Sequence, residues 1–375
     1  MTSSVVALMA VAGTARVRES HAAISKFSTP DDLAHMRWDG VTSVTQAING
    51  LMVSDVGHVS VADPATWPMA GLVAAAHGNG SKIFVPLHSP SKEEMTRLLA
   101  SPVDHSMLTK VASQATSLAV SAGYDGIMVD LEGLKPPSEL GLETLVGALR
   151  DSLHQQSPQA RLMVTVYAAK LLGKARNMLP YNVSRLAQLS DSIFIMGYDM
   201  TWVDAHPGAA SHEAGPNAPI NGLMKTVKNA IEWGAPSASL LLGLPLYGRL
   251  FTCDGRTPPA LGNCSCAEHN FVNRVVDELA AAASGPGCIH GFDEPSASPF
   301  FDCAHGSNIS QSPPWPGVRQ QAWFEDSRSI SAKLQLAVSH ELAGVAWWTA
   351  HGVRSDLSPE GQRIWDSIAQ FVHGD

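Results

Sequence analysis

Two acidic residues, Asp130 and Glu132, end a run of mostly apolar residues that begins at Gly126. Because successive side chains of a β-strand point to opposite faces, we expect Met128, Asp130 and Glu132 to share one face. Carboxyl groups two residues apart on a strand lie about 6–7 Å apart at the backbone, so they can share a proton or a hydrogen bond. Their proximity and partial burial should raise the pKa of at least one of them, as a general acid requires. The run therefore predicts acid–base chemistry at the end of a strand.

The opposite face of this expected strand carries three apolar side chains that suit contact with a layer of helices: Ile127, Val129 and Leu131. A strand that is apolar on one face and acidic at the end of the other is typical of a parallel strand in a catalytic barrel. The alternative is a structural ion pair, but Lys and Arg are scarce near the other expected strand ends. We favour a functional role, since charged groups in such a place cost free energy.

Aromatic residues end three further apolar runs: Tyr167, Tyr198 and Trp348. Each of them alone is more often a core residue than a ligand contact. Barrel enzymes build their sites from the carboxyl ends of several strands, so we expect these side chains to lie near Asp130 and Glu132. Flat aromatic faces beside a carboxylate pair favour a carbohydrate ligand, whose sugar rings stack on apolar surfaces and offer many hydroxyl groups.

Short apolar runs alternate with amphipathic segments along the chain. Eight runs are expected to be strands: Ala22–Phe27, Ser43–Ile48, Lys82–Leu87, Gly126–Glu132, Leu162–Tyr167, Ser192–Tyr198, Leu240–Leu246 and Gly344–Trp348. Helical patterns cover six segments: Ala65–His77, Met107–Ala122, Ser138–Gln155, Ile220–Trp233, Ser329–Glu341 and Pro359–His373. This alternation predicts parallel strands with right-handed crossovers, and eight units predict a (β/α)8 TIM barrel over residues 21–375. An open doubly wound sheet is the alternative.

The seventh connection is expected to hold an insertion, residues 249–325, between strand 7 and helix 7. The runs that start at Leu240 and Gly344 lie much farther apart than the ~30 residues of one βα unit. The insertion contains all of the cysteines: Cys253, Cys264, Cys266, Cys288 and Cys303. We expect disulfides with one thiol left over, because the Cys-x-Cys spacing is too short for the usual zinc-ligand pair. Insertions after barrel strands lie on the active-site face, so this one is expected to wall the site.

The composition fits a globular protein with a large core, since 45% of the 375 residues are hydrophobic and 16% are charged. The net charge of −9 and the lack of a Lys/Arg cluster argue against a nucleic-acid partner. No apolar run reaches the ~18–20 residues of a membrane-spanning helix. A neutral ligand is compatible with this charge.

Several features favour the secretory pathway. An apolar segment, Val5–Gly13, precedes the small residues Thr14 and Ala15, so residues 1–20 are predicted to be a signal peptide, with a disordered N-terminus as the alternative. Four Asn-x-Ser glycosylation signals occur at Asn79, Asn182, Asn263 and Asn308. Together with the expected disulfides they predict a lysosomal or extracellular glycoprotein.

Several of these residues resemble the motifs of a known family. The segment from Asp125 to Glu132 resembles the Asp-x-x-Asp-x-Asp-x-Glu signature of family 18 glycoside hydrolases, the chitinase family. Met196-Gly-Tyr198-Asp199 resembles the Met-x-Tyr-Asp motif of that family, and Trp348 resembles its floor tryptophan. Other segments are similar to one branch of the family, the lysosomal di-N-acetylchitobiases: Leu244–Cys253, Gln321–Asp326, Gly344–Ala350 and Asn217-Ala-Pro219.

The resemblance implies a retaining hydrolase whose substrate supplies the nucleophile. Glu132 would protonate the glycosidic oxygen and later activate water, while Asp130 and Tyr198 would hold the acetamide group of the sugar. The remaining implied substrate contacts are Asp199, Met196, Tyr167, Trp348, Asn217 and Met128. No cofactor and no metal are implied. The expected partners are N-acetylglucosamine oligosaccharides in the chitobiose core or in chitin oligomers, bound by a monomer.

Met128 departs from the family pattern, because it occupies the position of the second aspartate of the signature. A thioether is at best a weak hydrogen-bond acceptor, so the rate and the pH optimum depend on what replaces the acid. A chitin-oligosaccharide-binding lectin on the same barrel, with little or no activity, is therefore the alternative function. A metal-dependent hydrolase would need inward histidine ligands, and His88 and His351 after two expected strands form no known zinc pattern.

Overall fold

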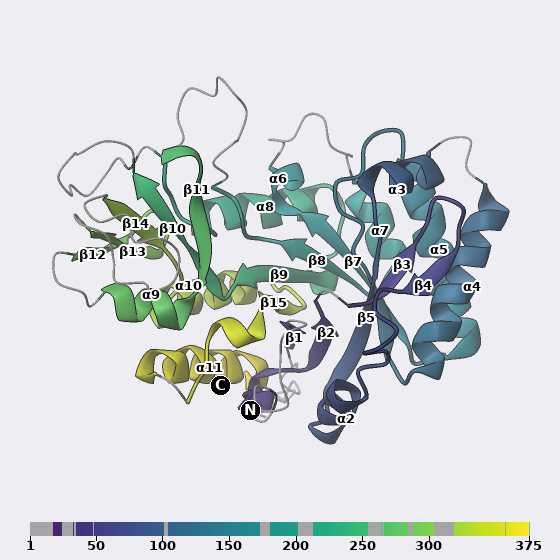
Figure 1. The fold of residues 1–375 in the computed structure, drawn as a ribbon, viewed down its shortest axis with the longest axis horizontal. Coiled ribbons are helices and arrows are strands. Elements are labelled where there is room, and N and C mark those ends of the chain that lie inside the picture. Colours follow the sequence, from purple (N-terminus) through teal and green to yellow (C-terminus); the bar gives the residue numbers. More distant parts are fainter. Residues whose placement is uncertain are drawn as a thin grey trace, which may run out of the picture.

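Eight parallel strands form a closed barrel, which lies at the centre of the ribbon (Figure 1). The computed structural model describes residues 18–24, 33, 35–47, 49–100, 104–172, 181–201, 213–253, 264, 266–283, 288–303, 319–356 and 358–374. The barrel strands are β1 (Glu19–Ile24), β2 (Ser43–Gln46), β5 (Lys82–His88), β6 (Gly126–Val129), β7 (Arg161–Tyr167), β8 (Ser192–Met196), β9 (Leu240–Pro245) and β15 (Gly344–Trp348). They pair in the order β2-β1-β15-β9-β8-β7-β6-β5, and the β2–β5 pairing closes the ring. The predicted (β/α)8 barrel is confirmed, and the open sheet is wrong.

Helices surround this barrel and follow most of the predicted segments. The longer helices are α2 (Ala70–Gly78), α3 (Lys92–Leu99), α4 (His105–Ser121), α5 (Glu139–Gln156), α7 (Val183–Leu189), α8 (Ile220–Glu232), α10 (Ser327–Ser339) and α11 (Pro359–His373). Shorter pieces are α6 (Ala168–Leu171), η1 (Trp38–Gly40), η2 (Ser237–Ser239) and η3 (Ala350–Gly352). A small hairpin of β3 (Leu51–Val53) and β4 (Val59–Val61) extends the sheet beside β5. The sequence patterns did not predict this hairpin or the short helices α3, α6 and α7.

The two faces of the barrel strands bury different residues, as the alternation predicted. Inside the barrel, Met128 packs in a compact cluster with Phe84, Met163 and Phe194. Outside it, Ile127 and Val129 belong to the much larger core that the helices cover. Gly126 begins β6 where a Cβ atom would lie 2.2 Å from the Arg161 carbonyl oxygen, so the close approach of β7 requires glycine here.

Aspartates tie the strands together at the amino-terminal ends. Asp125 accepts a hydrogen bond from the Ile83 backbone N–H at 2.8 Å, and Asp191 accepts one from Leu162 N–H at 2.7 Å. These side chains satisfy backbone donors at the start of β5 and β7, which would otherwise lack a partner in the sheet. They fix the register of strands that carry site residues at their opposite ends.

The predicted insertion forms a second sheet after strand β9. It comprises β10 (Tyr247–Cys253), β11 (Cys266–Val275), α9 (Val276–Ala283), β12 (Cys288–Asp293), β13 (Ser298–Cys303) and β14 (Gln320–Trp323). The strand order is β11-β10-β14-β13-β12, and this sheet stands beside the barrel, away from α4 and α5 (Figure 1). Disulfides join Cys253 to Cys264 and Cys288 to Cys303, as the disulfide prediction expected.

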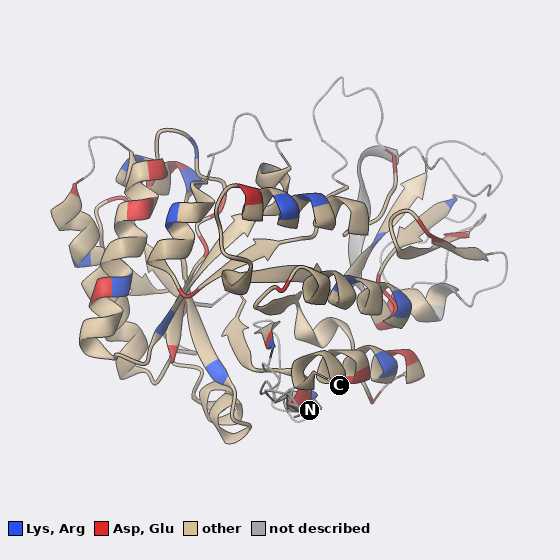
Figure 2. Ribbon diagram, turned by 180° about the vertical axis from the view of Figure 1, so that it is seen from behind, with Lys and Arg blue, Asp and Glu red and all other residues tan. Residues whose placement is uncertain are grey.

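Some predictions fall on residues that the structure does not describe. Residues 1–17 of the predicted leader lie outside the described part, and β1 begins at Glu19, two residues before the expected barrel boundary. The side chain of Cys266 and the glycosylation signals at Asn263 and Asn308 also lie outside it. None of the helices described combines the length and apolar character needed to cross a membrane. Lys/Arg and Asp/Glu are interspersed along the outer helices that Figure 2 shows.

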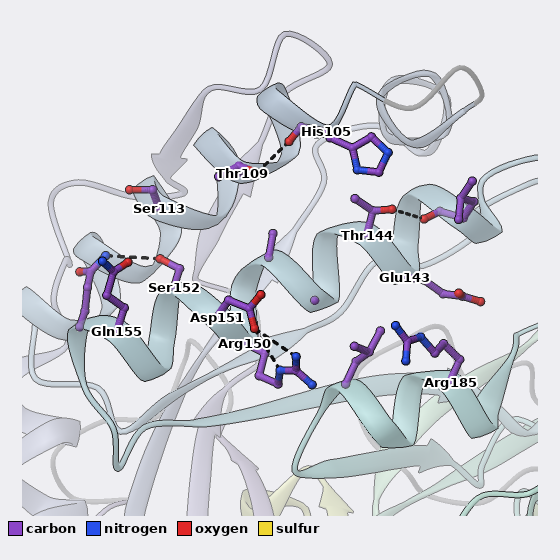
Figure 3. A pocket seen from close by; sticks show the side chains of 15 residues that line it. His105, Thr109, Ser113, Glu143, Thr144, Arg150, Asp151, Ser152, Gln155 and Arg185 are labelled. Carbon is purple, nitrogen blue, oxygen red and sulfur yellow. Dashed lines mark hydrogen bonds and ion pairs between the residues drawn. The ribbon is translucent and has the colours of Figure 1, made fainter.

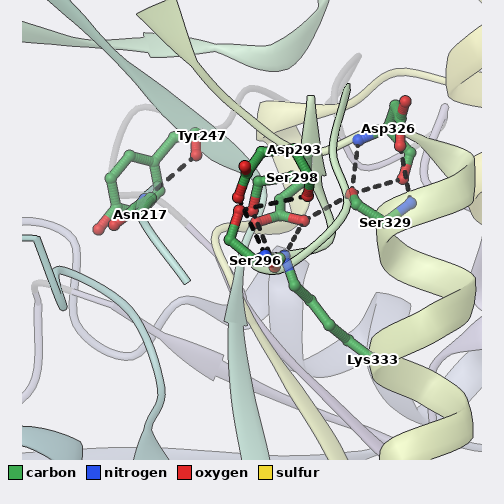
Figure 4. A network of polar contacts seen from close by, with 9 residues as sticks. Asn217, Tyr247, Asp293, Ser296, Ser298, Asp326, Ser329 and Lys333 are labelled. Atoms are coloured by element: carbon green, nitrogen blue, oxygen red, sulfur yellow. Dashed lines mark hydrogen bonds and ion pairs between the residues drawn. The ribbon is translucent and has the colours of Figure 1, made fainter. Parts of the chain in front are cut away.

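A buried ion pair lies where the insertion returns to the barrel. Lys333 on α10 reaches Glu325, which follows β14, and both side chains are fully buried. Ser329 donates a second hydrogen bond to the Glu325 carboxylate at 2.6 Å, while Ser329 and Asp326 form the capping box of α10 (Figure 4). Burial raises the pKa of Glu325 and lowers the pKa of Lys333, so each group depends on the other to stay charged.

We predict that Lys333→Met lowers the free energy of unfolding by about 3–5 kcal/mol, because Glu325 then remains buried without its cation. The double variant Glu325→Leu/Lys333→Met should lose much less, since no buried charge is left. Chemical denaturation of the two variants and the wild type measures both values. Equal losses in the single and double variants would show that packing, and not the charge pair, stabilises this junction.

Candidate active site

Glu132 lies just beyond the end of β6 and is hydrogen-bonded to Tyr167 at the end of β7. The Tyr167 hydroxyl donates to Glu132 Oε2 at 2.5 Å. Part of the Glu132 side chain is exposed, but the surrounding protein still removes water from its carboxyl group. This burial and the nearby Asp130 raise the pKa of Glu132, while the hydrogen bond from Tyr167 acts in the opposite direction. Glu132 is thus a carboxyl group adjusted towards the protonated form that a general acid needs.

Tyr167 is a reliable donor in this pair. Burial and the negative charge of Glu132 raise the pKa of Tyr167 far above its ordinary value, so the phenol keeps its proton. Tyr181 lies close enough for its pKa to rise as well, first through burial and then through Glu132 and Asp130. Both tyrosines therefore stay neutral, and neither provides a positive charge that would compensate the carboxylates.

Asp130 is held from two neighbouring strands. Its side chain is 6% exposed, and its Oδ1 accepts a hydrogen bond from Thr165 Oγ1 on β7 at 2.8 Å. On the other side, His88 Nδ1 at the end of β5 lies 3.5 Å from Asp130 Oδ2. The backbone N–H of Asp130 donates to the Leu87 carbonyl at 3.0 Å, which continues the β5–β6 pairing past the assigned end of β6. The carboxylate therefore has a fixed place at the carboxyl ends of three adjacent strands.

The predicted aromatic residues come together as expected. Tyr198 follows β8 and stacks on Trp348 at the end of β15, with ring centroids 6.3 Å apart and planes 24° from parallel. Tyr247 meets Tyr198 edge to face at 6.4 Å. Burial raises the pKa of Tyr198 well above its ordinary value, so its hydroxyl remains a donor. Tyr198 and Trp348 are partly exposed and line the carboxyl end of the barrel.

Asp199 is fixed by residues of the insertion. Its Oδ1 accepts hydrogen bonds from Tyr247 Oη and Arg249 Nη2, both at 2.5 Å, and both donors lie on β10. Its backbone has φ of +55°, a left-handed conformation that costs a non-glycine residue roughly 1–2 kcal/mol. Asn217 Oδ1 accepts the Asp199 N–H at 2.7 Å, and Asn217 Nδ2 donates to the Tyr247 carbonyl at 3.3 Å (Figure 4). These contacts hold Asp199 in place, because strained backbone persists only where its surroundings determine it.

Three of the predicted substrate contacts lie in the interior. Met128 exposes 1% of its surface, Met196 7% and Asn217 1%. Met128 and Met196 belong to the apolar cluster inside the barrel, against which Tyr167 and Tyr198 pack. Met128 packs in that cluster, and Asn217 accepts the Asp199 N–H, so both side chains contact groups that support the candidate site.

Several site residues were not predicted from the sequence. Thr165, Tyr247 and Arg249 donate hydrogen bonds to the carboxylates named above, and the pKa of Tyr181 responds to Glu132 and Asp130. Thr165 lies two residues before Tyr167 and shares its face of β7, so alternation could have found it. Tyr247 and Arg249 share a face of β10 in the same way, but their partner Asp199 is 48 and 50 residues away in the chain.

Among the described residues, no group of three or more His, Cys, Asp or Glu side chains is arranged to hold a metal ion. His88 instead lies beside Asp130, and His351 follows β15 in η3. A groove of about 620 Å³ lies elsewhere, between α4, α5 and α7 on the outside of the barrel (Figure 3). Its lining mixes His105, Glu143, Arg150 and Arg185 and includes none of the predicted site residues. The carboxyl ends of the barrel strands therefore remain the candidate site.

A closed (β/α)8 barrel with a carboxyl group of raised pKa among aromatic side chains is typical of a barrel enzyme that uses general acid–base catalysis. Comparison with known proteins then gives the family. A model of the glycosyl hydrolases family 18 matches residues 93–352, more than half of the chain. The chain belongs to this family.

The relatives are distant. Human di-N-acetylchitobiase is 22% identical over 299 residues, which are 75% of this chain and 69% of the relative. A Bacillus subtilis protein named as a sporulation-specific glycosylase, YdhD, is 25% identical over 242 residues, 64% of this chain and only 50% of its own length. A Cycas revoluta family 18 chitinase, solved in complex with (GlcNAc)4, superposes with a TM-score of 0.75 at 16% identity and covers 94% of this chain and 99% of its own. At such identity the structural likeness establishes the fold.

We predict that Tyr167→Phe shifts the alkaline limb of the pH profile of kcat/KM to higher pH. The hydrogen bond from Tyr167 stabilises the Glu132 carboxylate, so its loss raises the pKa of Glu132 further. A general acid is active when protonated, and activity then persists to higher pH. The measurement is hydrolysis of a chito-oligosaccharide across the pH range.

Tyr124→Phe is the matched control, because Tyr124 stacks on Trp67 at 5.3 Å on the outer side of the barrel. That variant should keep the wild-type profile. A shift of the Tyr167→Phe limb to lower pH would mean that Tyr167 does not stabilise the carboxylate.

Proposed function

We propose that this chain hydrolyses β-1,4-linked N-acetylglucosamine oligosaccharides by retaining, substrate-assisted catalysis, with Glu132 as acid and base. The observation that carries the proposal is the Glu132 carboxyl group, whose pKa is raised by burial and by Asp130 and which Tyr167 holds at 2.5 Å. Membership of glycosyl hydrolases family 18 supports the reaction class. The similarity to di-N-acetylchitobiase supports the substrate class, with the chitobiose core or chitin oligomers as candidates.

In the first step, protonated Glu132 donates its proton to the glycosidic oxygen as the bond to the anomeric carbon breaks. The carbonyl oxygen of the sugar's own acetamide group attacks that carbon and forms a cyclic intermediate. Asp130 accepts a hydrogen bond from the acetamide N–H, and the Tyr198 hydroxyl donates one to the acetamide oxygen. Both positions fit the structure, because Asp130 is fixed by Thr165 and Tyr198 retains its proton.

In the second step, Glu132 is a carboxylate and accepts a proton from water. The water oxygen attacks the anomeric carbon and breaks its bond to the acetamide oxygen, which opens the cyclic intermediate. Two displacements at the same carbon retain its configuration. Because the substrate supplies the nucleophile, one acid–base carboxyl group suffices, which is an exception to the usual two-carboxylate scheme of glycosidases.

The remaining predicted residues would bind the sugar. Trp348 and Tyr167 offer faces on which sugar rings can stack, and Asp199 offers a carboxylate oxygen to a hydroxyl group. We place Met196 and Met128 beneath this surface and Asn217 behind Asp199, according to their burial. The insertion, residues 249–325, would wall the site, because Arg249 and Tyr247 on its first strand already contact Asp199.

We further propose that the protein acts as a monomer in the lysosome or outside the cell. Two disulfides within the insertion support an oxidising compartment.

The second candidate function is a lectin that binds the same oligosaccharides. The buried thioether of Met128 favours it, since this side chain cannot provide the polar partner that an acid would offer to Asp130.

We predict that Glu132→Gln lowers kcat on defined chito-oligosaccharides by about 10²–10⁴-fold, the usual contribution of general acid–base catalysis. An amide cannot donate and accept the proton as the carboxyl group does, while its shape should leave binding unchanged. A product time course on oligomers of defined length, with calorimetric binding, measures both quantities and also shows the direction of cleavage.

The control is Glu143→Gln in the outer groove, which should retain full activity. Unchanged hydrolysis by Glu132→Gln would refute the assigned acid. A wild-type chain that binds the oligosaccharides without cleaving them would establish the lectin.

A further inference from the structure

His88 makes a contact that the reaction scheme does not use. It is the last residue of β5, its side chain is 19% exposed, and its Nδ1 approaches Asp130 twice. Nδ1 lies 3.4 Å from the Asp130 backbone oxygen and 3.5 Å from Asp130 Oδ2. Because β5 and β6 are neighbouring barrel strands, the backbone itself brings His88 to this place.

The surroundings of the imidazole determine which nitrogen carries hydrogen. Both Asp130 atoms near Nδ1 are acceptors, so only an N–H at Nδ1 can bond to them. Nε2 is buried and has no hydrogen-bond partner among the described residues. A hydrogen placed on Nε2 instead would leave a donor there without an acceptor and remove the contact with Asp130. The ring is therefore oriented as a donor towards Asp130, whose backbone oxygen and Oδ2 both lie within 3.5 Å of Nδ1.

The side chain that precedes Asp130 on its face of the strand offers it no polar partner. The neighbouring side chain on the same face of β6 is Met128, which lies in the apolar cluster inside the barrel. A thioether donates no hydrogen bond and accepts one only weakly. Thr165 contacts Oδ1 from β7, so Oδ2 depends on His88 from β5. Thr165 and His88 are thus the side chains described in contact with the two oxygens of this carboxylate.

We propose that His88 is a positioning residue that holds Asp130 in the orientation needed to accept the acetamide N–H of the substrate. In this chain it supplies, from the adjacent strand, the polar contact that Met128 cannot supply. This inference rests on the proposed function. His88 itself touches no reacting atom, because its effect passes through Asp130.

The position of the nitrogen gives a sharp test. The amide nitrogen of asparagine lies as many bonds from the backbone as Nδ1, whereas that of glutamine lies one bond farther. His88→Asn should therefore keep most of the activity. His88→Gln should lower kcat about 10–100-fold, as expected when a polar contact with a charged group and the correct orientation of that group are lost. KM should change by less than about 3-fold, because the aromatic surfaces stay in place.

A second background tests the connection with Met128. Met128→Asn introduces an amide beside Asp130 on the same face of β6, so His88→Gln should cost less in that background than in the wild type. His77→Gln is the matched control, because His77 Nε2 contacts Asp125 Oδ2 at 2.9 Å at the other end of β6. That control should leave kcat unchanged. His88→Ala replaces His88→Gln if thermal unfolding shows that the glutamine variant does not fold.

The outcomes separate this inference from the proposed function. Equal losses in His88→Asn and His88→Gln, or equal costs of His88→Gln in both Met128 backgrounds, would reduce His88 to a packing residue. Full activity of the His88 variants, while Glu132→Gln is inactive, would overturn the inference and leave the proposed function intact. A wild-type chain without hydrolytic activity would overturn both.

Discussion

The carboxyl groups of Asp130 and Glu132 lie at the end of a buried strand, and among the described residues no lysine or arginine is in hydrogen-bond contact with them. The other residues of the site must therefore hold these two groups without a salt bridge to either. Neutral or weakly basic donors stabilise them in place of cations: Thr165 and His88 for Asp130, and Tyr167 for Glu132. A salt bridge would fix both groups as carboxylates and lower their pKa values. Hydroxyl donors orient the groups and still allow Glu132 to hold a proton.

The insertion contributes side chains that contact a residue of the candidate site. Its first strand supplies Tyr247 and Arg249 to Asp199, and its last strand leads into Glu325, which forms the buried pair with Lys333 of α10. The second sheet is thus fastened to the barrel at both ends. The geometry around Asp199 depends on that attachment, because a left-handed aspartate requires fixed surroundings.

Much of the fold could be predicted because hydrophobic periodicity encodes it locally. Gly344–Trp348 and Pro359–His373 agree with the predicted bounds, since each has clear signals at both ends, such as the Ser358 cap and Pro359 of α11. The hairpin β3–β4 and the helices α3 and α7 are too short to show a period. The alternation of side chains along a strand also predicted that Met128 and Asp130 share a face. The contacts of Asp130 with His88, and of Asp199 with Arg249, join separate elements, and no local pattern in the sequence contains them. The pairing of Cys288 with Cys303 follows the register of β12 and β13, which no local pattern in the sequence contains either.

The central claim is that the acetamide group of the substrate, and not a water molecule, makes the first attack on the anomeric carbon. The anomeric configuration of the first product tests it most directly. Proton NMR during the first minutes of hydrolysis of a chito-oligosaccharide, before mutarotation, records the newly formed reducing end. The account predicts the β-anomer, because two displacements retain the configuration. An initial excess of the α-anomer would mean that water attacks directly from the opposite face, and would contradict the account.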